Sequence, residues 1–484
     1  MKSPLGRFNL FFTNIAFFGG LKVLGALFPL FIFPFVTRRL DGADAFGMYD
    51  IFLVISSLSA SVAMMGIPDA MFRQYYIKCN AEYRKEVTAT GFVIVVTAAI
   101  IVSLMVAILK NFIQVMVLND NHYYSIIYFA AFYILLQNLF NVSVHPSRLD
   151  NNKKHLLFNT LFYAVIFYAV VLLLLHLSYG LYALIYAHLV AAGIMAIYFI
   201  YLNSSNFFPV RFSKDIAWKL LQVGLPLMPI FLIYWANNSI VRILIMKYLG
   251  ATELGVFAIG SKYASVSTFL QMAFAGGWSF FTFSTMNDKD HVSIKSRIFE
   301  ALLFIIVVGY AIIVPLAPYF FGLVFLGDYA RGYVVFGQLF LAPLFLILYQ
   351  IIASQFVIIG KSHYSLISLS VGFSVSLLLS FVFLKMGSGI AGLSYSIPIS
   401  YLTAILIAYF FTRKFKIFDL NFESFVSFGF IIVMNIVLQI EHGLRVYIFL
   451  SPLLLIYCYI NKRLILELIH MIKRLGLRRF RTNE

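Results

Sequence analysis

Residues 40–49 read Leu-Asp-Gly-Ala-Asp-Ala-Phe-Gly-Met-Tyr, and residues 249–257 read Leu-Gly-Ala-Thr-Glu-Leu-Gly-Val-Phe. With one deletion, both stretches share the pattern Leu-x-x-x-acid-x-Gly-x-aromatic, about 208 positions apart. Each follows one long apolar segment and precedes another, and six such segments separate the copies. An even number of crossings returns the chain to the same side of a membrane. The pattern therefore predicts a parallel repeat of two six-helix lobes.

The composition around this repeat is that of a membrane protein. Of the 484 residues, 62% are hydrophobic and 11% are charged, whereas soluble domains are about 45–50% apolar and about 25% charged. This excludes a soluble multidomain enzyme and a disordered chain. The two cysteines, Cys79 and Cys458, are far apart and support neither a disulfide framework nor a metal site. We expect the net charge of +17 to reflect basic cytoplasmic loops that contact anionic lipid headgroups, and not binding of nucleic acid.

Long apolar segments bounded by charged or turn residues predict about fourteen transmembrane helices. The segments do not alternate in hydropathy, so an all-α polytopic protein is expected and not a barrel. They span about 10–36, 46–67, 88–109, 123–144, 156–177, 180–202, 225–247, 254–281, 299–320, 333–359, 364–384, 390–412, 424–440 and 444–460.

The distribution of Lys and Arg predicts the orientation. Most of the 36 Lys and Arg residues fall at segment ends that become cytoplasmic if both termini are inside. The expected domains are an N-lobe (1–208), a C-lobe (209–418), two further spans (419–462) and a basic cytoplasmic tail (463–484) on the anionic inner leaflet. No cleavable signal and no large outer domain are expected.

Several basic residues lie within or at the ends of the first, seventh and eighth predicted spans. Burying such a charge in a bilayer costs about 3 kcal/mol on insertion scales. Individually, these residues could be interfacial anchors or could snorkel outward, and Lys262 could pair with Glu253 or Asp50. Together they predict a cationic cavity that binds a polyanion, most simply phosphate groups. The candidates are Lys22, Arg38, Arg39, Arg242, Lys247 and Lys262.

Uncharged polar residues and helix breakers complete the candidate site. Amides inside spans are candidates for sugar contacts, although interhelical hydrogen bonding is the alternative. The sugar-contact candidates are Asn237, Asn238 and Gln271, with Gln137 as a further span amide. Prolines kink membrane helices, and the acidic residues mark the repeated segments. The gating candidates are Pro29, Pro34, Arg73, Asp41, Asp44 and Glu253.

The sequence carries no pattern that indicates chemistry. It has no Walker motif, no paired histidines and no acidic cluster with metal-ligand spacing. We therefore expect a protein that is not an enzyme and that holds neither a metal nor a cofactor. Coupling to the membrane potential, to protons or to sodium stays open.

The segments 34–49 and 66–73, which read Pro-Phe-Val-Thr-Arg-Arg-Leu-Asp-Gly-Ala-Asp-Ala-Phe-Gly-Met-Tyr and Gly-Ile-Pro-Asp-Ala-Met-Phe-Arg, resemble the Wzx-type polysaccharide flippases. These belong to the multidrug/oligosaccharidyl-lipid/polysaccharide exporter superfamily. Residues 248–257 are similar to that family's loop between the seventh and eighth helices. The resemblance implies two six-helix lobes with two appended helices.

The resemblance also implies a function. It suggests a bacterial inner-membrane flippase that moves undecaprenyl-pyrophosphate-linked oligosaccharide repeat units outward by alternating access, as for O-antigen and lipopolysaccharide. Polysaccharide polymerase and chain-length proteins would be partners. A lipid II flippase and a multidrug exporter of the same superfamily are alternatives, although deep basic residues disfavour cationic drugs. A membrane glycan polymerase is a further alternative, which the lack of a large outer loop disfavours.

Overall fold

The computed structural model describes residues 29–77, 80–118, 125–284, 291–440 and 445–467. Within these ranges the regular structure is entirely helical, which confirms the predicted all-α class. The chain packs as two compact units. Unit 1 holds the described residues up to Lys262 with Phe325–Gly332 and Ser376–Ser396, and unit 2 holds the rest. The lobes and tail proposed from the sequence follow the repeat and the charges, not this packing, and they stay a prediction.

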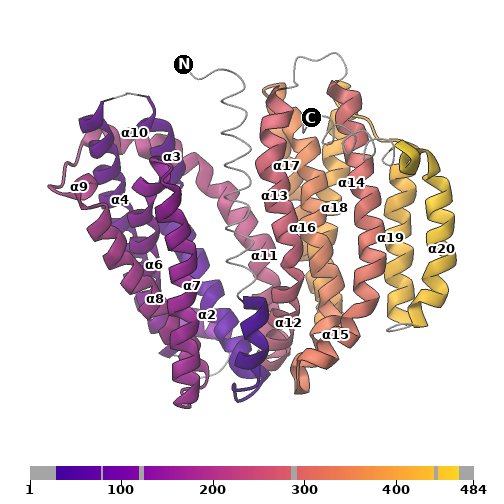
Figure 1. The fold of residues 1–484 in the computed structure, drawn as a ribbon, viewed down its shortest axis with the longest axis horizontal. Coiled ribbons are helices and arrows are strands. Elements are labelled where there is room, and N and C mark those ends of the chain that lie inside the picture. Colours follow the sequence, from indigo (N-terminus) through magenta and orange to yellow (C-terminus); the bar gives the residue numbers. More distant parts are fainter. Residues whose placement is uncertain (1–28, 78–79, 119–124, 285–290, 441–444, 468–484) are drawn as a thin grey trace, which may run out of the picture. The chain divides into compact units, whose positions relative to one another are not determined.

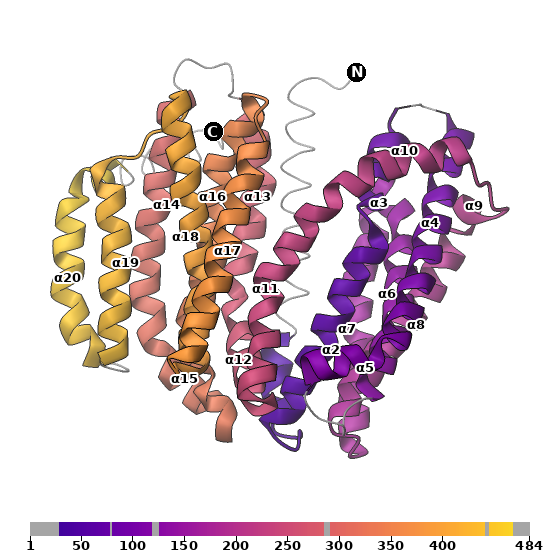
Figure 2. The same ribbon diagram turned by 180° about the vertical axis from the view of Figure 1, so that it is seen from behind.

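The helices of unit 1 come almost entirely from the first half of the chain (Figures 1 and 2). In both views α4, α6 and α8 run side by side, and α2 packs on this group. After the helical residues 29–37, the elements are α2 (Ala43–Met64), α3 (Ile67–Tyr75), α4 (Ala81–Ile108), α5 (Lys110–Ile113), η1 (Gln114–Leu118), α6 (Ser125–Leu149), α7 (Lys153–His176), α8 (Leu181–Leu202), α9 (Ser204–Phe207), α10 (Lys214–Gly224), η2 (Leu225–Leu227), α11 (Met228–Leu249), α12 (Ala251–Ala264) and η4 (Gly327–Gly332).

Unit 2 is built around α16, which packs against α13 and α14, while α19 lies between α14 and α20. Parts of α17 and α18 belong to each unit. The elements are α13 (Val266–Ser284), α14 (His291–Ile313), η3 (Val314–Leu316), α15 (Ala317–Val324), α16 (Tyr333–Ile358), α17 (His363–Lys385), α18 (Gly389–Phe415), α19 (Phe422–Ile440) and α20 (Val446–Ile460).

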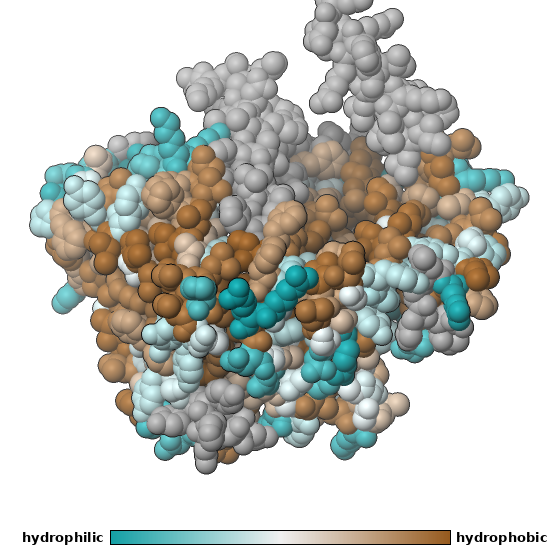
Figure 3. Space-filling model, turned by 60° about the horizontal axis from the view of Figure 1, so that its bottom comes forward, coloured by the Kyte–Doolittle hydropathy of each residue, from teal (hydrophilic) through white to brown (hydrophobic). Residues whose placement is uncertain are grey.

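Many of the described helices are long and apolar enough to cross a membrane. Ten pass by length and hydropathy, and eleven do so if α10–η2 and α11, bent by 44° relative to each other, form one span. The predicted count of about fourteen is thus not confirmed, because much of the first predicted span lies outside the described residues and α20 has only 15 residues. Apolar side chains cover broad areas of the surface in Figure 3. On α4, for example, Ile101, Leu104 and Ile108 are exposed. The chain is a multi-pass membrane protein.

The two copies of the repeated sequence begin α2 and α12, and they meet inside unit 1. Asp44 and Glu253, the equivalent acids, both lie in the first turn of their helix, where a negative charge is favoured. The equivalent glycines let the backbones touch. A Cβ on Gly47 would lie 2.0 Å from the Ala251 carbonyl oxygen, and one on Gly255 would lie 1.8 Å from that of Ala43. No residue larger than glycine fits this crossing without moving a helix.

The element η4 braces the same crossing. The Tyr329 hydroxyl donates to the Gly42 carbonyl oxygen at 2.6 Å, and the Tyr329 ring meets Phe46 edge-on. Arg331 pairs with Glu253 at 2.7 Å. The starts of α2 and α12 are therefore tied to a common third segment.

Replacing Gly255 with alanine should destabilise the protein, since its Cβ would collide with the backbone of α2. Overpacking of this kind costs about 1–3 kcal/mol, which should appear as a lower midpoint of thermal unfolding in detergent. Gly309→Ala in α14 is the matched control, because a Cβ there meets no described atom within 4 Å. Equal midpoints for the two variants would contradict the backbone crossing.

Candidate functional site

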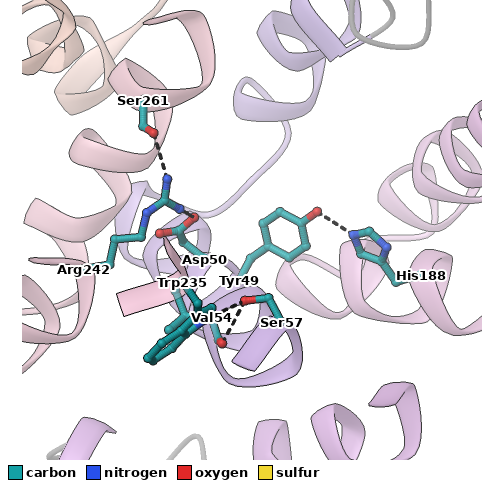
Figure 4. Close-up of polar contacts among 8 residues, drawn as sticks. All are labelled: Tyr49, Asp50, Val54, Ser57, His188, Trp235, Arg242 and Ser261. Carbon is teal, nitrogen blue, oxygen red and sulfur yellow. Dashed lines mark hydrogen bonds and ion pairs between the residues drawn. The ribbon is translucent and has the colours of Figure 1, made fainter. Parts of the chain in front are cut away.

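Arg242 of α11 is the centre of a polar cluster in unit 1 (Figure 4). Its Nη1 donates to Oδ1 of Asp50 in α2 at 2.5 Å, and its Nη2 donates to the Ser261 hydroxyl in α12 at 2.8 Å. The Asp50 side chain is 7% exposed and that of Arg242 is 23% exposed. A single guanidinium thus joins three helices, with a charged partner that offsets the unfavourable burial of each ion.

The Asp50 carboxylate has unused capacity to accept hydrogen bonds. Its Oδ2 atom is buried and has no hydrogen-bond partner among the described residues. Lys262 lies on α12, one residue beyond Ser261, and its Nζ sits 4.3 Å from the centre of the Phe33 ring. A cation over an aromatic face is attracted by the ring quadrupole. Among the described residues of unit 1, this cluster therefore brings together two cations, Arg242 and Lys262, and the carboxylate of Asp50.

A small compartment of about 170 Å³ opens beside Arg242. It is lined by Leu53, Val54, Ser56, Ser57, Tyr133, Gln137, Ser239 and Arg242. A large compartment of about 500 Å³ shares Ser57 and Gln137 with it. The large compartment lies between α2, α3, α6 and α11, and its other lining residues are Ala60, Ser61, Met64, Gly66, Pro68, Asp69, Asn141, Phe231, Tyr234, Trp235 and Asn238.

The two compartments differ in chemistry. The small one contains a guanidinium, whereas the large one combines aromatic rings with hydroxyl, amide and carboxylate groups. Trp235 is fixed in place because its Nε1 donates to the Ser57 hydroxyl at 3.1 Å, which in turn donates to the Val54 carbonyl at 3.0 Å (Figure 4). The two compartments together therefore present a mixed polar and apolar lining with a guanidinium at one end.

A histidine in an aromatic cluster supports the α2 side of the site. His188 Nε2 lies 2.7 Å from the Tyr49 hydroxyl, and its Nδ1 lies 3.1 Å from that of Tyr163 and 3.3 Å from that of Tyr133 (Figure 4 shows the Tyr49 contact). Tyr49 precedes Asp50 in α2, and Tyr133 lines the small compartment. The cluster therefore fixes the rotation of α2 that aims Asp50 at Arg242.

The structure brings together some of the basic candidates and separates others. Arg242 and Lys262 lie in one interior cluster. Arg38 and Arg39 are exposed after the helical residues 29–37, and Lys247 lies in the last turn of α11; none of these three lines either compartment. Lys22 lies outside the described residues. Whether any of them binds substrate stays a prediction.

The uncharged and gating candidates also lie in different parts of the structure. Asn238 lines the large compartment, with its Nδ2 donating to the Tyr234 carbonyl. Asn237 is buried outside it, and Gln271 belongs to unit 2. The gating role of the remaining candidates stays a prediction. Pro29 and Pro34 lie within the helical residues 29–37, and Asp41 lies before α2. Asp44 and Glu253 lie in the first turns of α2 and α12, and Arg73 is exposed on the last turn of α3.

Sequence reasoning missed the partner of Arg242. Asp50 was considered only as a partner of Lys262, and Glu253 pairs instead with Arg331. The available signal is an aspartate inside a predicted span, because such a carboxylate usually faces the interior of the helix bundle and pairs with another polar group. Asp69 and Asn141 were also not recognised as cavity residues, because α2, α3 and α6 bring them together only in the fold.

The sequence profile of the family described as "Polysaccharide biosynthesis protein" matches residues 36–334. This covers more than half of the chain, including Asp50, Asp69 and Arg242. The chain belongs to the polysaccharide biosynthesis protein family. No curated protein matches it.

Solved structures show the same fold. The chain is similar to the lipid II flippase MurJ in an inward closed conformation, with 15% identity, a TM-score of 0.67, and coverage of 92% of this chain and 98% of that one. It is also similar to an inward-facing multidrug resistance MATE transporter of the MOP superfamily, with 16% identity, a TM-score of 0.62, and coverage of 78% and 92%. A third likeness is to a MOP superfamily transporter from Pyrococcus furiosus, with 15% identity, a TM-score of 0.57, and coverage of 84% and 94%. The polysaccharide biosynthesis family member described here thus has the fold of MOP transporters.

Removing the charge of Asp50 should strongly destabilise the protein, because Arg242 would keep a buried charge without a counter-ion. Breaking a buried pair costs about 3–5 kcal/mol. The double variant Asp50→Asn/Arg242→Gln should cost less than the sum of the single variants, measured as detergent unfolding midpoints in a double-mutant cycle.

The matched control for this cycle is the exposed pair of Arg211 and Glu82, 3.4 Å apart, with Glu82 75% exposed. Glu82→Gln should cost about 0–1 kcal/mol. Additive effects at Asp50 and Arg242, or an equal loss in the control, would show that the pair does not stabilise this region.

Proposed function

We propose that the protein is a flippase for polyprenyl-pyrophosphate-linked oligosaccharides, which it moves from the inner to the outer leaflet of a bacterial cytoplasmic membrane for surface polysaccharide synthesis. The observation that carries the proposal is a guanidinium, that of Arg242, at one end of a cavity whose lining also holds amide, hydroxyl, aromatic and aliphatic groups and the carboxylate of Asp69. Membership of the polysaccharide biosynthesis family supports it. Both termini are proposed to be cytoplasmic, from the distribution of Lys and Arg.

Arginine suits the pyrophosphate because its planar fork donates parallel hydrogen bonds to phosphate oxygens. Asp50 holds the guanidinium in place before substrate arrives. An incoming pyrophosphate competes with Asp50 for Arg242, while Ser56, Ser57 and Ser239 supply further hydroxyl groups in the small compartment. Substrate binding and the helix contacts of Arg242 are thereby linked, since the same atoms serve both.

Transport proceeds by alternating access in this proposal, with the glycan in the polar cavity and the polyprenyl tail in the bilayer. An inside-negative potential favours outward movement of an anion by about 2.3 kcal/mol per charge per 100 mV. The potential, a proton gradient or a sodium gradient supplies the driving force. Anionic lipids, and polysaccharide polymerase and chain-length proteins, are the proposed partners.

Deleting the gene in the organism that carries it tests the function against its rivals. We expect single repeat units on polyprenyl pyrophosphate to accumulate in lipid extracts and surface glycan to disappear. Intact surface glycan with new sensitivity to cationic drugs would instead identify a multidrug exporter, and arrested peptidoglycan synthesis would identify a lipid II flippase. A purified protein that elongates glycan chains would be a polymerase.

Two variants test the role of Arg242 in binding. Arg242→Gln should weaken binding of polyprenyl pyrophosphate to the purified protein in nanodiscs about ten- to hundredfold, as expected for losing a charge-assisted hydrogen bond. Asp50→Asn should strengthen it, because it replaces the competing carboxylate with a neutral amide, which binds the guanidinium more weakly. Arg211→Gln is the control for a lost surface charge. Unchanged binding by both Arg242→Gln and Asp50→Asn would contradict the assignment.

A further inference from the structure

The large compartment has an electrostatic character opposite to that of the small one. Among the described residues that line it, Asp69 alone carries a charge at neutral pH, and that charge is negative. Arg242 lines only the small compartment. The cavity as a whole therefore has a cationic end and an anionic end, joined at Ser57 and Gln137.

Asp69 is held in this position by the start of α3. Met65 and Gly66, both with positive φ (46° and 65°), separate α2 from α3, and Pro68 occupies the first turn. Asp69 lies in that turn, where the helix dipole favours an ionised carboxylate. The side chain is exposed, and no described residue forms a hydrogen bond or ion pair with it. Its carboxylate is available to a ligand in the large compartment.

A second polar group in the compartment also has no hydrogen-bond partner among the described residues. The Gln137 Oε1 atom is buried and accepts no hydrogen bond from any described residue. Carboxylate and amide oxygens both accept hydrogen bonds, so the unfilled positions call for donors such as sugar hydroxyls or amino groups. Trp235, Tyr234 and Phe231 add apolar faces of the kind on which sugar rings pack.

From this charge distribution we propose that Asp69 selects the glycan of the substrate. The large compartment accepts neutral or amino sugars, whose hydroxyl and ammonium groups donate to Asp69 and Gln137, and it disfavours sugars that carry a carboxylate. A carboxylate on the sugar would be repelled by that of Asp69, because both carry a negative charge in one cavity. This inference rests on the proposed function and adds the chemical class of the glycan.

The test uses full-length protein in nanodiscs and three lipid probes: polyprenyl pyrophosphate alone, the same lipid carrying a neutral disaccharide, and the same lipid carrying a disaccharide with one uronic acid. The unaltered protein should bind the neutral glycolipid about tenfold more tightly than the acidic one. Asp69→Asn should remove this preference and leave binding of the sugar-free lipid unchanged.

Asp215→Asn is the matched control, because Asp215 is also exposed in the first turn of a helix, α10, but lies outside both compartments. It should keep the preference of the unaltered protein. If sugar-free lipid still binds, either of two results would overturn the inference. One is equal binding of the two glycolipids by the unaltered protein, and the other is a preference that survives in Asp69→Asn. If no polyprenyl pyrophosphate binds and a cationic amphiphile binds through Asp69, the proposed function itself fails.

Discussion

The ion pair between Arg242 and Asp50 is the interaction on which the rest of unit 1 depends. A bilayer tolerates neither ion alone, so the pair fixes how α2 faces α11, and the bond from Arg242 to Ser261 adds α12. The pair also places a guanidinium beside a polar cavity. Under the proposed function, stability and recognition depend on the same three side chains, and a phosphate that binds Arg242 also acts on the packing of the helices.

Close backbone contact less than one turn before Asp50 in α2 complements this pair. Gly47 and Gly255, equivalent positions of the repeated sequence, allow α2 and α12 to cross with their backbones in contact. Small residues commonly create such crossings between membrane helices. The repeated motif is thus explained by geometry: the glycine permits the crossing, and the acid that precedes it favours the start of each helix.

Much of the fold follows from the sequence, since apolar segments of about 20 residues are helical wherever they are described. The repeat and the interior position of Arg242 were likewise visible in the residues. The pairing of Arg242 with Asp50, and of Glu253 with Arg331, was not, because each joins residues far apart in the chain. Asp69, Gln137 and Asn141 share a cavity only because α2 and α3 both pack against α6, which no local pattern encodes. Arg38 and Arg39, although basic and close to a predicted span, are exposed and line neither compartment.

The central claim is that Arg242 exchanges its internal carboxylate partner for the phosphate of a lipid-linked substrate. The most direct test is an experimental structure of the protein in nanodiscs with bound polyprenyl-pyrophosphate oligosaccharide. The account predicts phosphate density within hydrogen-bonding distance of the Arg242 guanidinium, and glycan density in the large compartment beside Trp235. A bound pyrophosphate elsewhere, with the pair of Arg242 and Asp50 intact and the compartment empty of sugar, would contradict it.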